Sequence, residues 1–422
     1  MFCGFVKSRT DQTKLPRVVW AAAWVSFFAD FSTELYYGVL PAFYLQTLSL
    51  SIVTLGIIEG VAESIVAITK LWSGTLSDRT GHRPVWMVAG YGISALAKPL
   101  MAFASGGVLS GLLRGMDRFG KGIRGAPRDA LLSESIDDRR RGRAFGVVRA
   151  MDHAGALVGG VAAAGVLALG LVVPRDLFLL SVIPGVAAVG VIVLYVREPK
   201  APNKPVQIKH KPFSLLSAWH DATPQLKSYL YPASLFALGN ASDMLLLAIA
   251  YERFIESGYS QPVALGILPL LWALLHVIKS VGSSWAGSNS DRFGYLPMLR
   301  LGWVVYSAVY ALAAWLAFGG PAWLAWGMFA LYGFYTVLTE APEKALISAM
   351  TPDGYKRGSA YGLIHFVAGI GTLPATLIAS AVWFRFGAGY AFGIDAAIAG
   401  LAVLFLGRVR SSTEVLGDQE VF

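Results

Sequence analysis

The chain has 422 residues, of which 55% are hydrophobic and only 14% are charged. A soluble protein of this composition would expose too much apolar surface to water, so we exclude a soluble globular fold. The net charge of +9 does not indicate a nucleic-acid partner, because the basic residues gather in separate short segments. The single cysteine, Cys3, excludes an intrachain disulfide, and we expect neither a metal site of structural zinc spacing nor a cofactor.

Twelve apolar segments follow one another, each long enough to cross about 30 Å of hydrocarbon as a helix. The first sixteen residues form a polar stretch that lacks a small-residue cleavage site, so we expect the first segment to remain as a membrane span. The segments are residues 18–47, 52–76, 85–104, 106–134, 143–171, 175–196, 228–254, 262–288, 297–318, 322–350, 357–384 and 390–409. The sequence therefore predicts an all-α membrane protein with twelve transmembrane helices.

Lys and Arg residues concentrate in alternate connections between these segments. One set of connections includes both ends of the chain and the Lys-rich stretch at 197–227, whereas the opposite set contains only Arg175, Arg253 and Arg385. Because basic connections stay in the cytoplasm, we predict a multi-pass protein of the cytoplasmic (inner) membrane with both termini cytoplasmic. We expect it to act as a monomer in the lipid bilayer.

A short motif occurs twice, each time between two predicted spans. Its first copy is Gly74 to Pro84 (GTLSDRTGHRP), and the second, 213 positions later, is Gly287 to Pro297 (GSNSDRFGYLP). Such an internal repeat predicts two six-helix halves whose interface handles a solute. We place the halves at residues 1–197 and 228–422, joined by a polar cytoplasmic linker at 198–227.

We expect both copies of the motif to be loops that latch the cytoplasmic side closed in one state. Glycine permits close packing and a tight turn, and the acidic and basic side chains can pair with neighbouring helix ends. The predicted latch residues are Gly74, Asp78, Arg79, Gly81, Arg83, Asp291 and Arg292.

The fourth predicted span carries an unusual number of charges. Each ionised group costs about 2.5 to 3.5 kcal/mol at the centre of a membrane helix, so this helix must line a cavity or meet partners of opposite charge. Carboxylates four residues apart on the first and second spans, and a charged face on the fifth, can supply those partners. The predicted proton-coupling and cavity residues are Asp30, Glu34, Glu59, Glu63, Arg114, Asp117, Arg118, Lys121, Arg124, Arg149, Asp152 and Asp243.

About half of these charges are expected to form structural ion pairs, whereas at least one carboxylate is expected to change protonation as the cavity opens. The second half is less charged. Glu340 and Lys344, four residues apart, are expected to pair, and His276 and His365 to be packing residues. Candidate substrate-binding residues are Tyr36, Tyr37, Asn240 and Glu340.

Over essentially its whole length the chain resembles the major facilitator superfamily. The first motif copy is similar to the family's signature between helices 2 and 3, with His82 where a basic residue is usual. Arg118 to Ala126 (RFGKGIRGA) resembles the helix 4 signature, with Lys121 in place of Gln. The resemblance implies two pseudo-symmetric six-helix bundles, a path lined by helices 1, 4, 7 and 10, and a role for Arg118 in coupling to a titrating carboxylate.

Two further resemblances bear on the transported solute. The family's antiporter signature in helix 5 is partly present, since Gly155, Gly159 and Gly160 match while Met151 and Ala156 replace Gly and Pro. RDALL and RGRAFG also resemble a branch that contains nickel exporters, whose members often end in a His-rich tail. Here the final residues, 411–422, contain no His.

We therefore predict a secondary active transporter that exports a small solute in exchange for protons by alternating access. Two alternatives remain: export of a divalent metal ion, and uptake of an anionic or zwitterionic organic solute, which the Arg and Lys of the fourth span would suit. No GxxxxGK[ST] sequence is present, so ATP is not the expected energy source. We expect neither an enzyme nor a non-transporting receptor, since no nucleophile, base and orienting group stand together.

The coupling residue is predicted to be Asp30 or Glu34. Both lie near the middle of the first span, where an unpaired carboxylate would favour its neutral form. Arg118, near the middle of the fourth span, is expected to approach this acid in one state and withdraw in the other.

Overall fold

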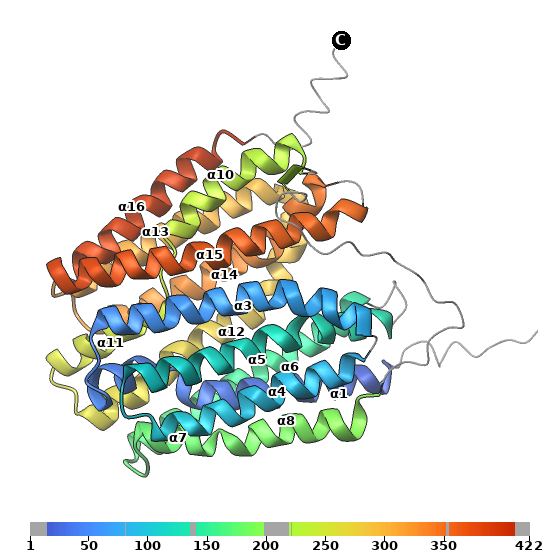
Figure 1. Ribbon diagram of the computed structural model, residues 1–422. Helices are drawn as coiled ribbons and strands as arrows, with labels where there is room; N and C mark the ends of the chain where they lie inside the picture. Colours follow the sequence, from blue (N-terminus) through green and yellow to red (C-terminus); the bar gives the residue numbers. More distant parts are fainter. Residues whose placement is uncertain are drawn as a thin grey trace, which may run out of the picture.

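The computed structural model describes residues 15–80, 82–135, 141–197, 219–220, 222–351 and 354–409, and in this part of the chain the regular secondary structure is all helical, without strands (Figure 1). The helices of the first half are α1 (Arg17–Tyr37), α2 (Leu40–Ala42), the π-helix η2 (Phe43–Thr47), α3 (Ile52–Thr80), α4 (Arg83–Leu100), the 3₁₀ turn η3 (Met101–Phe103), α5 (Gly107–Glu134), α6 (Arg141–Ala168), α7 (Pro174–Leu180) and α8 (Val182–Tyr195). Those of the second half are α10 (Pro224–Leu238), α11 (Asp243–Glu256), α12 (Gln261–Phe293), α13 (Tyr295–Ala317), α14 (Leu324–Met350), α15 (Gly354–Phe386) and α16 (Ala388–Leu406).

The prediction of an all-α membrane protein is confirmed. Within the described residues, nine stretches are long and apolar enough to cross a membrane. The other three predicted spans coincide with α1, α5 and α14, whose polar and charged residues lower their hydropathy. The twelve predicted segments thus all have helical counterparts.

The predicted span at 228–254 is wrong as a single helix, because α10 ends at Leu238 and α11 begins at Asp243. Side chains of neighbouring helices replace the lost helical hydrogen bonds. The hydroxyls of Tyr306 and Tyr310 donate to the carbonyl oxygens of Gly239 and Ala241, each at 3.1 Å. The backbone N–H of Ser242 donates to Thr376 Oγ1 at 3.0 Å. The break is therefore built into the packing of the second half.

The predicted loops at the repeated motif are also corrected. α3 continues to Thr80 and α12 to Phe293, so most of each motif copy lies on the last turns of a helix. In the second motif copy, the only residue between α12 and α13 is Gly294. Its φ of 86° lies in the left-handed region that favours glycine. The two motif copies are helix ends joined to the next helix by very short turns.

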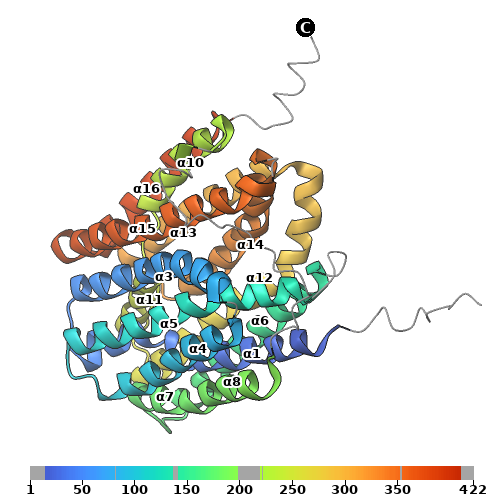
Figure 2. The same cartoon turned by 45° about the vertical axis from the view of Figure 1, so that its right-hand side comes forward.

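The helices form two groups that meet along two helix pairs. In Figures 1 and 2, α10, α13, α15 and α16 lie on one side of the molecule and α1, α4, α7 and α8 on the other. α3 packs against α15 and α6 against α12, which links the groups. Small residues bring α3 and α15 together, since a Cβ on Gly56 would lie 2.2 Å from the Ser380 hydroxyl. We propose that these groups are the predicted bundles at 1–197 and 228–422, although α10 already begins at Pro224, within the predicted linker 198–227.

An apolar seal joins the two groups at the end opposite the basic connections. We use this name for Tyr37, Gly38, Leu40, Pro269 and Trp272. The rings of Tyr37 and Trp272 lie 4.9 Å apart, and a Cβ on Gly38 would lie 2.8 Å from Pro269 Cα. Leu40, on α2, is completely buried, and α2 packs against α11.

Candidate functional site

A cavity of about 670 Å³ lies between the two groups of helices, nearer the basic end. Its walls come from α1, α3, α5 and α6 on one side, and from α15 and the α10–α11 break on the other. Charged side chains dominate its lining, namely Asp30, Glu63, Lys70, Lys121, Arg124, Arg128, Asp129, Arg149 and Asp152. Acids and bases therefore meet here in a space large enough for a small organic solute.

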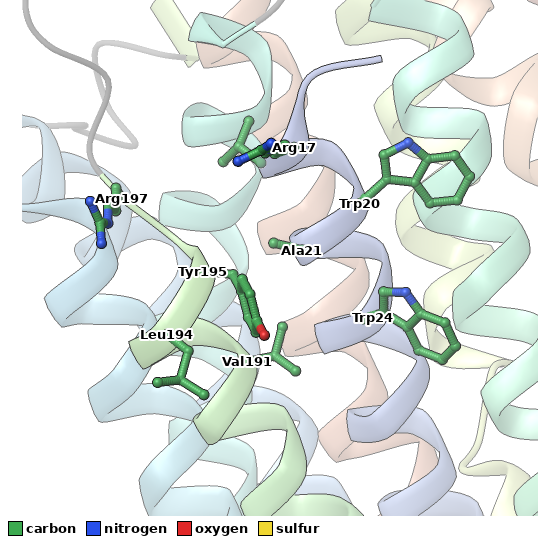
Figure 3. Close-up of a pocket in the computed structure, with 9 residues that line it drawn as sticks. Arg17, Trp20, Ala21, Trp24, Val191, Leu194, Tyr195 and Arg197 are labelled. Carbon is green, nitrogen blue, oxygen red and sulfur yellow. The ribbon is translucent and has the colours of Figure 1, made fainter. Parts of the chain in front are cut away.

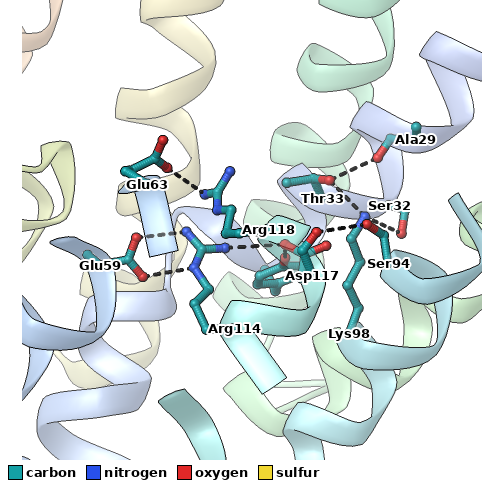
Figure 4. A network of polar contacts seen from close by, with 11 residues as sticks. Ala29, Ser32, Thr33, Glu59, Glu63, Ser94, Lys98, Arg114, Asp117 and Arg118 are labelled. Atoms are coloured by element: carbon teal, nitrogen blue, oxygen red, sulfur yellow. Dashed lines mark hydrogen bonds and ion pairs between the residues drawn. The ribbon is translucent and has the colours of Figure 1, made fainter. Parts of the chain in front are cut away.

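Beside this cavity, α5 is tied to α3 by a buried ion pair (Figure 4). Arg114 donates from Nε and Nη2 to the two carboxylate oxygens of Glu59, at 2.9 and 2.8 Å. Both side chains are 1% exposed. Asp117 lies 3.6 Å from Arg114 and accepts a long hydrogen bond, 3.5 Å, from the hydroxyl of Tyr36. Arg114 and Asp117 of α5 are thus paired with groups of opposite sign rather than exposed to lipid.

Arg118 faces α3 in this structure. Its guanidinium lies 3.6 Å from a Glu63 carboxylate oxygen and 5.8 Å from the centre of the Tyr37 ring. Tyr37 also lies 5.4 Å from the Arg114 guanidinium, so one aromatic ring contacts two cations. The ion pair of Arg118 is made with Glu63, not with Asp30 or Glu34.

Asp30 lies on the cavity wall with Asp152 of α6 and with Lys121 and Arg124 of α5. These groups are near enough to Asp30 to act on its carboxylate electrostatically. Arg124 stacks over the Tyr91 ring at 4.2 Å, and Arg149 lies 3.4 Å from Asp152. A carboxylate in this position experiences both an acid and two cations, so a change at any of them alters its protonation.

Glu34 lies one turn further along α1, in a histidine cluster that crosses between the groups. Its carboxylate lies 3.8 Å from His276 Nε2, and His276 Nδ1 lies 3.5 Å from His153 Nδ1. One Glu34 oxygen, Oε2, is buried without a hydrogen-bond partner in the structure. His276, expected to be a packing residue, also contacts a titratable group of α1 and one of α6.

Next to the histidines, Glu340 of α14 gathers three cations. Lys279, Lys344 and Arg149 lie 3.6, 3.7 and 3.8 Å from its carboxylate oxygens. The predicted pair of Glu340 with Lys344 is present, and Arg149 extends it across to α6. This cluster links the two groups of helices near the basic end. Glu340 is therefore a contact between the groups as well as a candidate substrate ligand.

The second half contributes polar groups at the α10–α11 break. Asn240 Oδ1 accepts a hydrogen bond of 2.9 Å from Tyr306, and Asn240 also lines the cavity. Asp243 opens α11 and accepts a hydrogen bond from the Tyr332 hydroxyl. An acid in the first turn of a helix is favoured by the helix dipole. Asn240 and Asp243 are thus held by hydrogen bonds from one tyrosine of α13 and one of α14.

The predicted latch falls largely outside what the structure describes. Gly81 lies outside the described residues, as do the surroundings of Gly74 and the side chains of Asp78, Arg79 and Asp291. Arg83 begins α4 and is partly buried, and Arg292 near the end of α12 is exposed. The latch remains a proposal.

Two buried charged residues were missed by the sequence-based prediction. Lys98 of α4 is 4% exposed, and its amine donates to the hydroxyls of Ser32 and Thr33 at 3.2 and 2.8 Å (Figure 4). Asp395 of α16 is 2% exposed, beside the α10–α11 break, where its backbone carbonyl would contact a Cβ on Gly239 at 3.1 Å. Each stands alone in an apolar segment, so only its isolation there could have drawn attention to it.

An all-helical membrane protein with a charged cavity between two groups of helices has the architecture of a solute transporter. The chain belongs to the Major Facilitator Superfamily, whose family model matches residues 22–343. An uncharacterized MFS-type transporter of Methanocaldococcus jannaschii is 28% identical over 417 residues, covering 95% of this chain and 97% of that protein. The multidrug resistance protein MdtH of Yersinia pseudotuberculosis is 28% identical over 114 residues, 27% of each chain. The crystal structure of a D-xylose–proton symporter superposes with a TM-score of 0.71 at 16% identity, covering 94% of this chain and 98% of that one.

Proposed function

We propose that this transporter exports a small organic solute in exchange for protons by alternating access. The observation that carries the proposal is the placement of Asp30 on the cavity wall among Asp152, Lys121 and Arg124. A solute with a negative or zwitterionic headgroup would compete with Asp30 for the two cations. Its arrival and the release of a proton from Asp30 are then linked through the same charges.

The direction of transport is supported by the partial antiporter signature and by the short match to a multidrug resistance protein. Uptake of an anionic or zwitterionic solute together with protons is the second candidate, because the same cations would serve it. Within the described residues, no group of three or more His, Cys, Asp or Glu side chains is arranged to hold a metal ion. Export of an organic solute is accordingly preferred to export of a divalent metal.

Coupling is proposed to involve Asp30 or Glu34. Asp30 faces the cavity, whereas Glu34 faces His276. With Arg118 paired to Glu63, the cations nearest Asp30 on α5 are Lys121 and Arg124. We therefore propose that Lys121 and Arg124, as well as Arg118, act electrostatically on the coupling carboxylate.

The test uses proteoliposomes loaded with a pH-sensitive dye, after a thermal-stability screen against organic anions, lipophilic cations and divalent metals has supplied a ligand. Solute added to liposomes containing the wild-type protein should drive proton movement. Asp30→Asn or Glu34→Gln should abolish this movement while solute counterflow persists. Glu256→Gln, an exposed acid paired with Arg253, is the matched control. Unchanged proton movement in both variants would refute the assignment and move attention to Glu63 and Asp152.

The proposed orientation is tested by cysteine labelling in a Cys3→Ser background. Cysteines at Lys204 and Ser257 should react from opposite sides of the membrane, the former from the cytoplasm. Equal labelling of both from outside would contradict the twelve-span arrangement.

The proposed latch is tested at Asp78, which lies near the end of α3. Asp78→Asn should abolish transport while the protein remains folded and monodisperse, because a latch acts on the conformational equilibrium. If the variant unfolds instead, Asp78 stabilises the fold and does not act as a latch.

A further inference from the structure

A second cavity, of about 860 Å³, lies away from the charged site, between the start of α1 and the end of α8. Figure 3 shows Arg17 at the start of α1 and Arg197 just beyond the end of α8 on either side of its mouth, with Tyr195 between them. Below the two arginines the walls are apolar and include Leu194, Trp20 and Trp24. The cavity is thus a groove with a cationic mouth and an apolar floor.

The groove faces outward from the helix bundle. Leu194 and Tyr195 are 65% and 68% exposed, and Trp20 is 49% exposed. On a membrane protein such apolar side chains contact acyl chains, and Trp and Tyr belong at the level of the lipid headgroups. Arg17 and Arg197 therefore lie at headgroup depth on the basic side of the membrane.

Within the described part of the chain, no side chain occupies the two guanidinium groups. Both side chains are exposed, and neither forms an ion pair or a side-chain hydrogen bond with another residue of the described chain. The flanking sequence continues basic, with Lys7, Arg9 and Lys14 against one acid, Asp11, before the groove. A site of this kind complements a phosphate group linked to hydrocarbon.

We propose that this groove binds one anionic phospholipid, with its headgroup phosphate between Arg17 and Arg197 and an acyl chain along the apolar floor. Guanidinium groups bind phosphate through paired hydrogen bonds, which fixes the headgroup more firmly than a diffuse positive surface would. The bound lipid would also hold α1 against α8, because it contacts the ends of both helices. The proposal depends on the chain spanning a membrane and not on the transported solute.

The test is native mass spectrometry of the full-length protein in detergent, with phosphatidylglycerol or phosphatidylcholine of matched acyl chains added in steps. We expect one phosphatidylglycerol to bind at least tenfold more tightly than phosphatidylcholine. Each interfacial cation contributes about fivefold, corresponding to about 1 kcal/mol, so the double variant Arg17→Gln/Arg197→Gln should bind phosphatidylglycerol roughly twenty-fivefold more weakly.

Two controls test whether the lipid binds at the groove. Arg408→Gln removes an exposed cation at the end of α16, where it stacks on Phe405, and should leave the affinity unchanged. Soluble glycerol phosphate, which lacks acyl chains, should not displace the lipid at equal concentration. Equal loss of binding in Arg408→Gln, or equal affinity for the two lipids, would overturn the proposal. Displacement by glycerol phosphate would assign the site to a free phosphate instead.

Discussion

His153 Nδ1 and His276 Nδ1 lie 3.5 Å apart, across the contact between α6 and α12. Lys279 and Arg149 lie beside them, and Glu34, Asp152 and Glu340 provide the nearby negative charge. Protonation of both rings would place two adjacent cations on the surfaces where the two helix groups meet.

Acidification is therefore expected to weaken the contact between α6 and α12. The loosening should increase as the pH falls, because acid protonates the imidazole rings. Spin labels at cysteines replacing Gly146 and Ser280 would report the separation of the two helices at a series of pH values from 8 down to 4. His276→Asn cannot take up the proton and should reduce the change. An identical response in His276→Asn would show that another group is responsible.

Gly155→Ala is expected to disrupt the packing of α6 against α1. A Cβ at this position would lie 2.1 Å from the carbonyl oxygen of Phe27, so the two helices would have to separate. Overpacking of this kind costs about 1 to 3 kcal/mol. A melting curve in detergent should show a lower transition temperature, with loss of transport.

Gly165→Ala, on the same helix, is the matched control because a Cβ there meets nothing within 4 Å. It should leave the transition temperature unchanged or slightly higher, since Ala favours helix. Equal destabilisation by both substitutions would show that the close approach to Phe27 is not the cause.

Glu59→Gln is expected to destabilise the protein because it leaves Arg114 buried and without its main partner. Removing one member of a buried pair costs about 3 to 5 kcal/mol. The double variant Glu59→Gln/Arg114→Gln should recover part of the loss, as measured by thermal unfolding. Glu256→Gln breaks an exposed pair and should change stability by at most about 1 kcal/mol. A double variant less stable than Glu59→Gln would contradict this account.

Tyr310→Phe is expected to weaken the α10–α11 break. Its hydroxyl bonds the carbonyl oxygen of Ala241, and a buried acceptor that loses its donor costs about 1 to 3 kcal/mol. The unfolding temperature should fall, whereas Tyr390→Phe, at a residue 59% exposed, should not change it. Stability equal to the wild type would mean that the break needs no support from Tyr310.

Much of the fold was predictable because hydrophobic length and the alternation of basic connections are direct signals of membrane spans. The break between Leu238 and Asp243 was not, because it depends on hydroxyl groups of α13 and α15 that are distant in sequence. Gly239, Asn240 and Ser242 carried a local polar signal, but a single polar cluster does not distinguish a broken helix from a continuous one.

The sequence allowed us to predict which charged residues form the site, but not which of them form ion pairs with one another. The sequence placed carboxylates on three helices opposite α5, and the structure pairs Arg114 with Glu59 and Arg118 with Glu63. Which carboxylate meets which cation depends on how each helix is rotated about its axis, and the near-uniform hydrophobicity of these spans leaves that rotation undefined. Lys98 was overlooked for the same reason, since its hydroxyl partners on α1 lie 66 and 65 positions away.

The apolar seal and the charged contacts at the opposite end give the two ends of the molecule different thermodynamics. Parting Tyr37 from Trp272 and Gly38 from Pro269 would expose apolar surface, a step with a positive heat-capacity change and little response to ionic strength. Parting Arg149 and Lys279 from Glu340 would instead be screened by salt. Temperature and ionic strength should therefore act on opposite halves of the transport cycle, so that each half can be slowed independently.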